Sequence, residues 1–220
     1  MSRSIKLLDS REDAAIKLID AIPMQKLKDE QWRLVGISKG GLELAYQIRA
    51  RLKNQIDFLF SEGINAPKNV ECEIARVSEN EQIVIDEKLI ESFEIKHDYI
   101  YGEAKRKYEE KILSYIYQYR KGRTFFDVKN KIVLLVDDGA NTGMKFMLAI
   151  KSIMSMKPKA LYIAVPVIPT DVLELLDSFS NEIYFLHSID HFVETGFYYK
   201  ELQNISEDRV EKILGEKYEV

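Results

Sequence analysis

Two adjacent carboxylates and a turn of small residues follow an apolar run in the second half of the chain. The run 132–136 is entirely aliphatic, Asp137 and Asp138 come next, and residues 139–143 read Gly-Ala-Asn-Thr-Gly. Such a turn after a buried strand leads into a helix whose free N–H groups and dipole can bind a phosphate. The acids would repel that phosphate, but they can accept hydrogen bonds from vicinal hydroxyls or hold Mg²⁺. The segment therefore predicts a site for a ribose 5-phosphate.

Each candidate motif in this sequence also has a simpler interpretation in which it plays no part in ligand binding. An acid pair after a strand can be an ordinary strand-to-helix turn with capping chemistry. The segment 38–41, Ser-Lys-Gly-Gly, also follows an apolar run, and glycines are common in turns of this kind. His187, Asp190 and His191 are close in sequence, but no fourth ligand is apparent, so we expect no metal there.

Short apolar runs alternate with segments of helical periodicity, which is typical of an α/β fold. We expect strands at 34–38, 56–60, 132–136, 160–167 and 182–187. We expect helices at 10–22, 42–53, 98–121, 144–156, 171–176 and 206–214. Residues 132–167 then form a βαβ unit, and the fold is a central parallel sheet flanked by helices.

Two neighbouring stretches have opposite charge. Residues 71–94 carry eight acidic and two basic side chains, a local charge of −6. Runs such as 83–85 there resemble hairpin strands, so we expect a mobile insertion. Residues 105–123 carry seven basic and two acidic side chains, a local charge of +5. Tyr101, Tyr108 and Tyr115 are spaced seven apart along the helix predicted there, which favours a core-facing or subunit-facing stripe.

The composition is that of an ordinary globular protein. The 220 residues include 32 basic and 36 acidic ones, a net charge of −4, and 46% are hydrophobic. Cys72 is the only cysteine and cannot form an internal disulfide. We find no signal-peptide pattern and no apolar stretch of transmembrane length, so we expect a cytoplasmic protein with no membrane partner. The mild acidity argues against a dedicated nucleic-acid coat.

As a set, these motifs resemble the type I phosphoribosyltransferases, whose signature is an apolar strand, two acids, a small turn and a Thr-Gly pair. Segments 38–41, 66–71, 164–167 and 192–198 also resemble stretches of a group of predicted bacterial phosphoribosyltransferases. The resemblance covers about residues 33–200 and is strongest at 132–143. It implies a single domain over 1–220, with a flexible lid at about 61–97 and a small C-terminal hood at about 183–200.

The resemblance implies transfer of ribose 5-phosphate from phosphoribosyl pyrophosphate (PRPP) to a nitrogenous base, with a purine as the first expectation, and release of pyrophosphate. Asp137 and Asp138 would bind the ribose hydroxyls. The 5-phosphate would lie on Gly139, Ala140, Asn141, Thr142, Gly143, Met144 and Lys145. Pyrophosphate would bind to Ser38, Lys39 and Gly40, and the base to Tyr184, Phe185 and Asp190. Mg²⁺ would be held through PRPP, without a strong set of protein ligands, and a homodimer is expected.

The chain departs from the family pattern at two places. Lys145 stands where the loop usually has Thr or Ser, and would meet phosphate as a point charge rather than a hydroxyl donor. In the lid, Val70 replaces a proline, and Glu73 and Arg76 replace small residues. One alternative is a non-catalytic PRPP or nucleotide sensor, or an RNA-binding regulator that uses the basic stretch 105–123, whose RNA retention would depend on salt. Another is hydrolysis, with water in place of the base.

Overall fold

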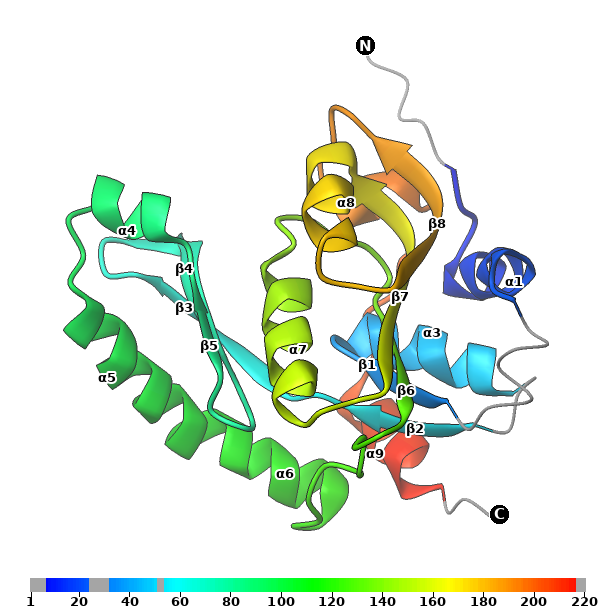
Figure 1. Ribbon diagram of the computed structural model, residues 1–220, viewed down its shortest axis with the longest axis horizontal. Coiled ribbons are helices and arrows are strands. Elements are labelled where there is room, and N and C mark those ends of the chain that lie inside the picture. The colour runs from blue at the N-terminus through cyan, green and yellow to red at the C-terminus, as the bar shows by residue number, and fades with distance from the viewer. Residues whose placement is uncertain (1–6, 24–31, 51–53, 217–220) are drawn as a thin grey trace.

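The computed structural model describes residues 7–23, 32–50 and 54–216, and it confirms the α/β class. Five parallel strands form the central sheet in the order β2-β1-β6-β7-β8 (Figure 1). Their bounds are β1 Arg33–Gly36, β2 Gln55–Phe58, β6 Ile132–Val136, β7 Ala160–Pro169 and β8 Glu182–Ile189. Four of the five sequence-predicted strands differ from these by one or two residues at an end, and β6 matches its prediction.

Helices cover both faces of this sheet (Figure 1). The helices α1 (Arg11–Ala21) and α3 (Lys39–Arg49) pack on one face, and α7 (Met144–Ser155) and α8 (Thr170–Asp177) on the other. Alternate strand residues therefore enter two separate cores: Leu134 lies on the α3 side and Leu135 on the α7 side. Burial on both faces explains why β6 is a continuous apolar run.

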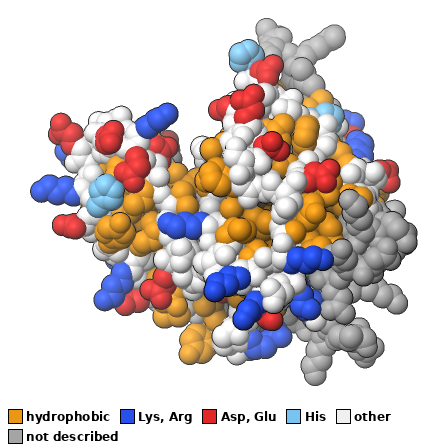
Figure 2. Space-filling model, viewed as in Figure 1, with side chains coloured by type: hydrophobic (Ala, Val, Ile, Leu, Met, Phe, Trp, Pro, Cys, Tyr) orange, Lys and Arg blue, Asp and Glu red, His pale blue; other side chains and the backbone are white. Residues whose placement is uncertain are grey.

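A second, smaller sheet lies beside this body. The strands β3 (Ser61–Ala66), β4 (Asn69–Ser78) and β5 (Ile83–Ile85) are antiparallel, with β5 at an edge, as the sequence predicted for 83–85. Together with α4 (Glu87–Ser92) and α5 (His97–Lys107) they form what we call the arm, residues 61–107. Figure 2 shows the arm and the body as two lobes with a notch between them. The predicted lid is thus a folded sheet here, and its mobility stays a prediction.

The prediction of one uninterrupted helix over 98–121 is wrong. A π-helical turn at Tyr108–Ile112 separates α5 from α6 (Leu113–Arg120). A π turn uses i→i+5 hydrogen bonds, so it rotates the residues that follow relative to those before it. The tyrosine stripe therefore does not share one buried face: Tyr101 is 54% exposed, whereas the Tyr115 hydroxyl donates to Glu62 at 2.9 Å.

The last segments close the α1 side of the body. A 3₁₀ turn at Thr195–Tyr198 and α9 (Glu207–Gly215) follow β8, and Leu8 forms a parallel bridge with Tyr199. The helix predicted at 42–53 begins three residues earlier than expected, because Ser38 leaves β1 and caps α3; residues 51–53 lie outside the described ranges. None of the helices that the structure describes is long and apolar enough to cross a membrane.

Candidate active site

The turns after β1 and β6 meet at one edge of the sheet. Gly36 pairs with Val136 in parallel register, so Ser38 and Asp137 follow side by side. The Ser38 hydroxyl donates to Asp137 Oδ1 and accepts from the N–H of Gly41 at 2.9 Å. Both turns open helices, α3 and α7, whose N-termini lie at this edge. Two motifs that are far apart in the sequence, 38–41 and 137–143, therefore lie together, with Ser38 and Asp137 in contact across 99 residues.

Asp137 is a buried carboxylate, only 1% exposed. Burial raises the pKa of Asp137 to about 7, because the charged form loses hydration. The charge of Lys145 opposes this shift, and the neighbouring charge of Asp138 adds to it. Oδ1 accepts from Ser38 and from the N–H of Asp138, whereas Oδ2 accepts no hydrogen bond from the described part of the chain. That oxygen is available to a ligand hydroxyl.

Asp138 is held by a residue that the sequence analysis missed. Arg11, at the start of α1, donates from Nε to Asp138 Oδ2 at 2.8 Å and from Nη1 to the carbonyl of Gln203. Both side chains of the pair are mostly but not fully buried. Oδ1 of Asp138 has no hydrogen-bond partner in the described ranges, so each acid of the pair keeps one free oxygen. No local pattern marks Arg11, because its partner lies 127 residues away.

The glycines of the first turn allow α3 to approach the acids. A Cβ at Gly40 would lie 1.9 Å from Asp138 Oδ2, and one at Gly41 would lie 2.3 Å from the backbone oxygen of Val136. Both distances are far below van der Waals contact, so any side chain here would move the acid pair or the helix. The N–H groups of Lys39 and Gly40 have no hydrogen-bond partner among the residues described, so they can donate hydrogen bonds to a bound anion.

The loop 139–143 offers a second set of free donors. The N–H groups of Asn141, Thr142 and Gly143 have no hydrogen-bond partner within the described ranges, and Gly143 has a positive φ of 74° that suits glycine. The C-terminal segment covers one side of this loop. Thr195 donates to Asn141 Oδ1 from its hydroxyl at 2.8 Å and its N–H at 3.2 Å, and Tyr199 donates to the Asp138 carbonyl at 2.7 Å.

Thr195 and Tyr199 are further site residues that the sequence analysis did not assign. A Cβ at Gly139 would lie 2.3 Å from Thr195 Oγ1, so the threonine occupies the space above that glycine. The resemblance of segment 192–198 to the family was the available signal for Thr195, but it did not indicate which residue touches the loop. The arrangement as a whole places two free helix N-termini on either side of a carboxylate pair.

Comparison with known proteins identifies the family. The family model described as "Phosphoribosyl transferase domain" matches residues 4–201. The chain belongs to the phosphoribosyl transferase domain family. This domain is similar in structure to TT1426 from Thermus thermophilus, with 26% identity, a TM-score of 0.76, and coverage of 96% of this chain and 98% of that one. The agreement extends over the arm and the C-terminal segment as well as the sheet, given that coverage.

Two curated proteins of Mycobacterium tuberculosis are similar in sequence to this phosphoribosyl transferase domain. They are named "Putative phosphoribosyl transferase MT0597" (strain CDC 1551 / Oshkosh) and "Putative phosphoribosyl transferase Rv0571c" (strain ATCC 25618 / H37Rv). Each is 22% identical over 210 residues, which cover 96% of this chain and 47% of the relative. The chain therefore spans about half the length of the curated relatives it matches.

Of the three residues predicted to bind the base, Phe185 and Asp190 reach the surface of this phosphoribosyl transferase domain and Tyr184 does not. Tyr184 is buried in the core, where its ring stacks on Tyr162 with centroids 6.0 Å apart and its hydroxyl donates to Glu182. Phe185 lies on the opposite face of β8 and is 38% exposed. Asp190 is exposed just past the end of β8 and accepts from the hydroxyl of Thr170 at 2.7 Å. The structure thus brings Phe185 and Asp190 to the surface and leaves Tyr184 away from it.

The alternative RNA surface is largely neutralised. In the basic stretch 105–123, ion pairs to acidic side chains involve Lys105, Arg106, Lys107, Arg120 and Lys121. Arg123 donates to two backbone carbonyls. Binding to an RNA backbone would require several of these contacts to break, so the geometry does not favour that function. In the described ranges no group of three or more His, Cys, Asp or Glu side chains is arranged to hold a metal.

Proposed function

We propose that this domain transfers the phosphoribosyl group of PRPP to a nitrogenous base and releases pyrophosphate. One observation carries the proposal: two helix N-termini with free N–H groups flank a carboxylate pair in which each acid keeps a free oxygen. PRPP has the matching chemistry, because it carries a phosphate at one end, a pyrophosphate at the other and two hydroxyls between them. The free donors suit the anionic ends, and the free carboxylate oxygens suit the hydroxyls.

In this proposal the loop 139–143 binds the 5-phosphate through its backbone N–H groups. Asp137 Oδ2 and Asp138 Oδ1 accept from the ribose hydroxyls, while Ser38 and Arg11 hold the other oxygens in place. The N-terminus of α3 binds the pyrophosphate. The bond from C1 to the pyrophosphate oxygen breaks with its electron pair leaving on that oxygen, and a nitrogen of the base forms the new bond to C1. The proton of that nitrogen passes to solvent.

Mg²⁺ would enter with the pyrophosphate group and offset its charge. The described residues offer no set of three or more acidic, His or Cys side chains for such an ion, so phosphate oxygens and water would supply most of its ligands, with Asp137 and Asp138 as the nearby acids. The first acceptor to test is a purine. Phe185 offers an exposed ring and Asp190 an exposed carboxylate that could accept from a ring N–H. A homodimer and a cytoplasmic location remain predictions.

The experiment is isothermal titration of the protein with PRPP and Mg²⁺. We expect micromolar binding by the wild type and loss of at least tenfold in affinity in the double variant Asp137→Asn, Asp138→Asn. The exposed Asp177 at the end of α8 supplies a control for this type of substitution, because Asp177→Asn removes one carboxylate charge away from the site. Binding that survives in the double variant, or no binding by the folded wild type, would overturn the proposal. A positive result leads to a screen of bases for pyrophosphate release.

A further inference from the structure

A small cavity lies where the arm meets the body, next to the acid pair. It encloses about 180 Å³, and part of its wall is apolar, from Ile37, Phe58 and Phe60. Its charged lining comes from both lobes, with Lys39 and Lys145 from the body and Glu62 and Arg76 from the arm. The hydroxyl-bearing residues of the lining are Ser38, Ser61, Tyr115 and Tyr119. The lining side chains carry three cations and one acid, which favours an anion.

Among the cations that line this cavity, Lys145 forms no ion pair within the described ranges, although its charge acts on Asp137. Lys39 forms an ion pair with Glu207, and Arg76 donates to both carboxylate oxygens of Glu73, at 2.7 and 2.8 Å. The ammonium of Lys145 makes neither a hydrogen bond nor an ion pair with any residue in the described ranges, and its side chain is exposed. An incoming anion can therefore bind Lys145 without breaking an existing contact.

Lys145 shares this cavity with the turn that follows β1. It lines the cavity together with Ser38 and Lys39, and no residue of 139–143 lines that cavity. Its charge also acts on Asp137, the acid that Ser38 contacts. The threonine or serine that the family usually has at this place has a shorter, uncharged side chain, whereas lysine carries its charge at the end of a flexible four-carbon chain.

We propose that Lys145 binds the pyrophosphate leaving group, together with the N-terminus of α3, and does not bind the 5-phosphate. This assignment rests on the proposed phosphoribosyl transfer. As the bond between C1 and the pyrophosphate oxygen breaks, negative charge accumulates on that oxygen, and a nearby ammonium stabilises it. Lys145 gives up no proton in this step. The substitution of a hydroxyl residue by lysine then removes a hydroxyl donor from the phosphate loop and adds a cation beside the departing group.

The test separates the two ends of PRPP by titrating them individually. Pyrophosphate with Mg²⁺ and ribose 5-phosphate are titrated into the wild type, into Lys145→Met and into Lys145→Thr. We expect both Lys145 variants to bind pyrophosphate about tenfold more weakly and to bind ribose 5-phosphate within twofold of the wild type. Lys151→Met is the control, because Lys151 lies on the same helix and donates to the Ile83 carbonyl, away from the cavity; its affinities should not change.

The remaining outcomes are all decisive. A loss confined to ribose 5-phosphate would assign Lys145 to the phosphate loop and overturn the proposal, and so would equal losses for both ligands or no change for either. A wild type that binds neither ligand would overturn the proposed transfer itself. A wild type that binds both, with unchanged Lys145 variants, would overturn only the assignment of Lys145.

Discussion

A guanidinium and two acidic side chains occur together both at the sheet edge and where the arm joins the body. At the sheet edge, Asp137 and Asp138 lie beside Arg11; at the junction of β2, β4 and α6, Asp57 and Glu79 lie on either side of Arg120. Burial raises the pKa of Asp57 and of Glu79, and the charge of Arg120 opposes the shift in both. The two places thus combine the same three charged groups, two carboxylates and one guanidinium, in different surroundings.

The junction cluster is closed to ligands. Asp57 accepts from the N–H groups of Phe58 and Phe126, at 2.8 and 3.1 Å, and Glu79 accepts from that of Phe60. The guanidinium of Arg120 lies 4.5 Å from the ring centroid of Phe60, and its Nε and Nη1 are buried without a hydrogen bond within the described ranges. These contacts fix the arm to the body and leave no oxygen for a substrate.

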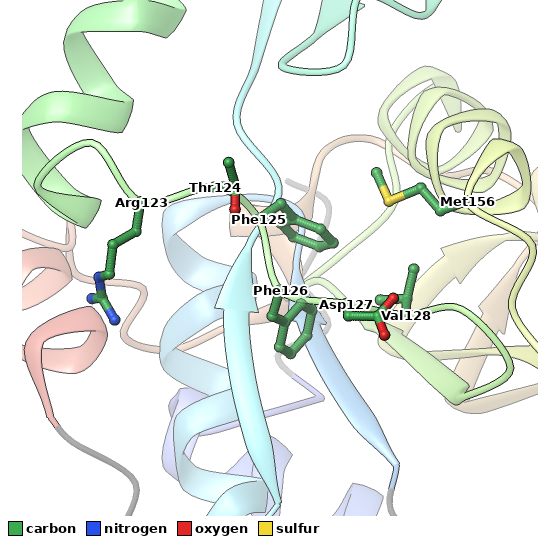
Figure 3. Close-up of a pocket in the computed structure, with 7 residues that line it drawn as sticks. All are labelled: Arg123, Thr124, Phe125, Phe126, Asp127, Val128 and Met156. Carbon is green, nitrogen blue, oxygen red and sulfur yellow. The ribbon is translucent and has the colours of Figure 1, made fainter.

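A cavity beside this junction further distinguishes it from the candidate active site. A cavity of about 670 Å³ is lined by the linker 123–128 and Met156, where Phe125 and Phe126 present their rings (Figure 3). Its titratable side chains are Arg123 and Asp127, and it lies at the amino end of β6, opposite the acid pair. Size alone does not mark a site here. The comparison teaches that free carboxylate oxygens and free N–H groups distinguish the sheet edge from a structural ion cluster.

Breaking the junction should have the largest effect on stability. Arg120→Met leaves two buried carboxylates without a counter-charge, so we expect the free energy of unfolding to fall by about 3–5 kcal/mol. Urea denaturation at neutral pH measures it. Arg106→Met is the control, because Arg106 pairs with Glu103 and Glu110 on an exposed helix face, and its removal should change stability far less. Equal effects of the two substitutions would refute a structural role for the junction.

Disturbing the close approach of α3 to the end of β6 should have the next largest effect on stability. In Gly41→Ala the new methyl group would meet the Val136 carbonyl at 2.3 Å, so the helix must shift, at a cost of about 1–3 kcal/mol. Gly102→Ala is matched to it, because nothing lies within 4 Å of that position in α5. There we expect a gain of about 0.5–1 kcal/mol from improved helix propensity. Relative to the wild type, the thermal unfolding temperature should fall in Gly41→Ala and rise in Gly102→Ala.

Double-mutant cycles compare how strongly the two guanidinium groups are coupled to their acidic partners. Arg11→Met and Asp138→Asn, separately and together, should give a coupling of about 1 kcal/mol, since the pair retains some solvent contact. The same cycle on Arg120 and Glu79 should give a larger value. If the Arg11 coupling equals or exceeds that of Arg120, the sheet edge is as rigidly fixed as the junction, and our distinction between them fails.

The last prediction concerns the pH dependence of stability. The raised pKa of Asp137 means that the folded state binds a proton more tightly than the unfolded chain, whose aspartate titrates near 3.8. This group therefore lowers stability as pH rises from about 4 to about 7, and its contribution is constant above that window. We expect Asp137→Asn to be less sensitive to pH in that interval than the wild type, in urea denaturation at several pH values. An unchanged slope would show that another group titrates there.

Much of the site could be predicted because its signals are local. The run 132–136 and the turn after it depend on neighbours in sequence, and the parallel register of β1 and β6 brings Ser38 to Asp137. The prediction failed where a partner comes from far along the chain. Arg11 looks like any basic residue in a helix, and only the packing of α1 places it at Asp138.

The predicted base contacts illustrate a different limit. Tyr184 and Phe185 are adjacent, so a strand must direct them to opposite faces, and the sequence did not indicate which face is the core. The register Ala164–Tyr184 places Tyr184 level with Val136, below the end of the sheet. The π turn at Tyr108–Ile112 likewise depends on the fit of the helix against β3, which periodicity does not encode.

Arg11 links the two ends of the domain through its contact with the Gln203 carbonyl, 192 residues away. During synthesis α1 leaves the ribosome before the rest of this domain, and almost the whole domain must follow before that partner exists. The central strands can pair earlier, but the acid pair acquires its final charge environment only when the last segment docks. A nascent or truncated chain would thus contain the sheet before it has a completed site, and ligand affinity would report the end of folding.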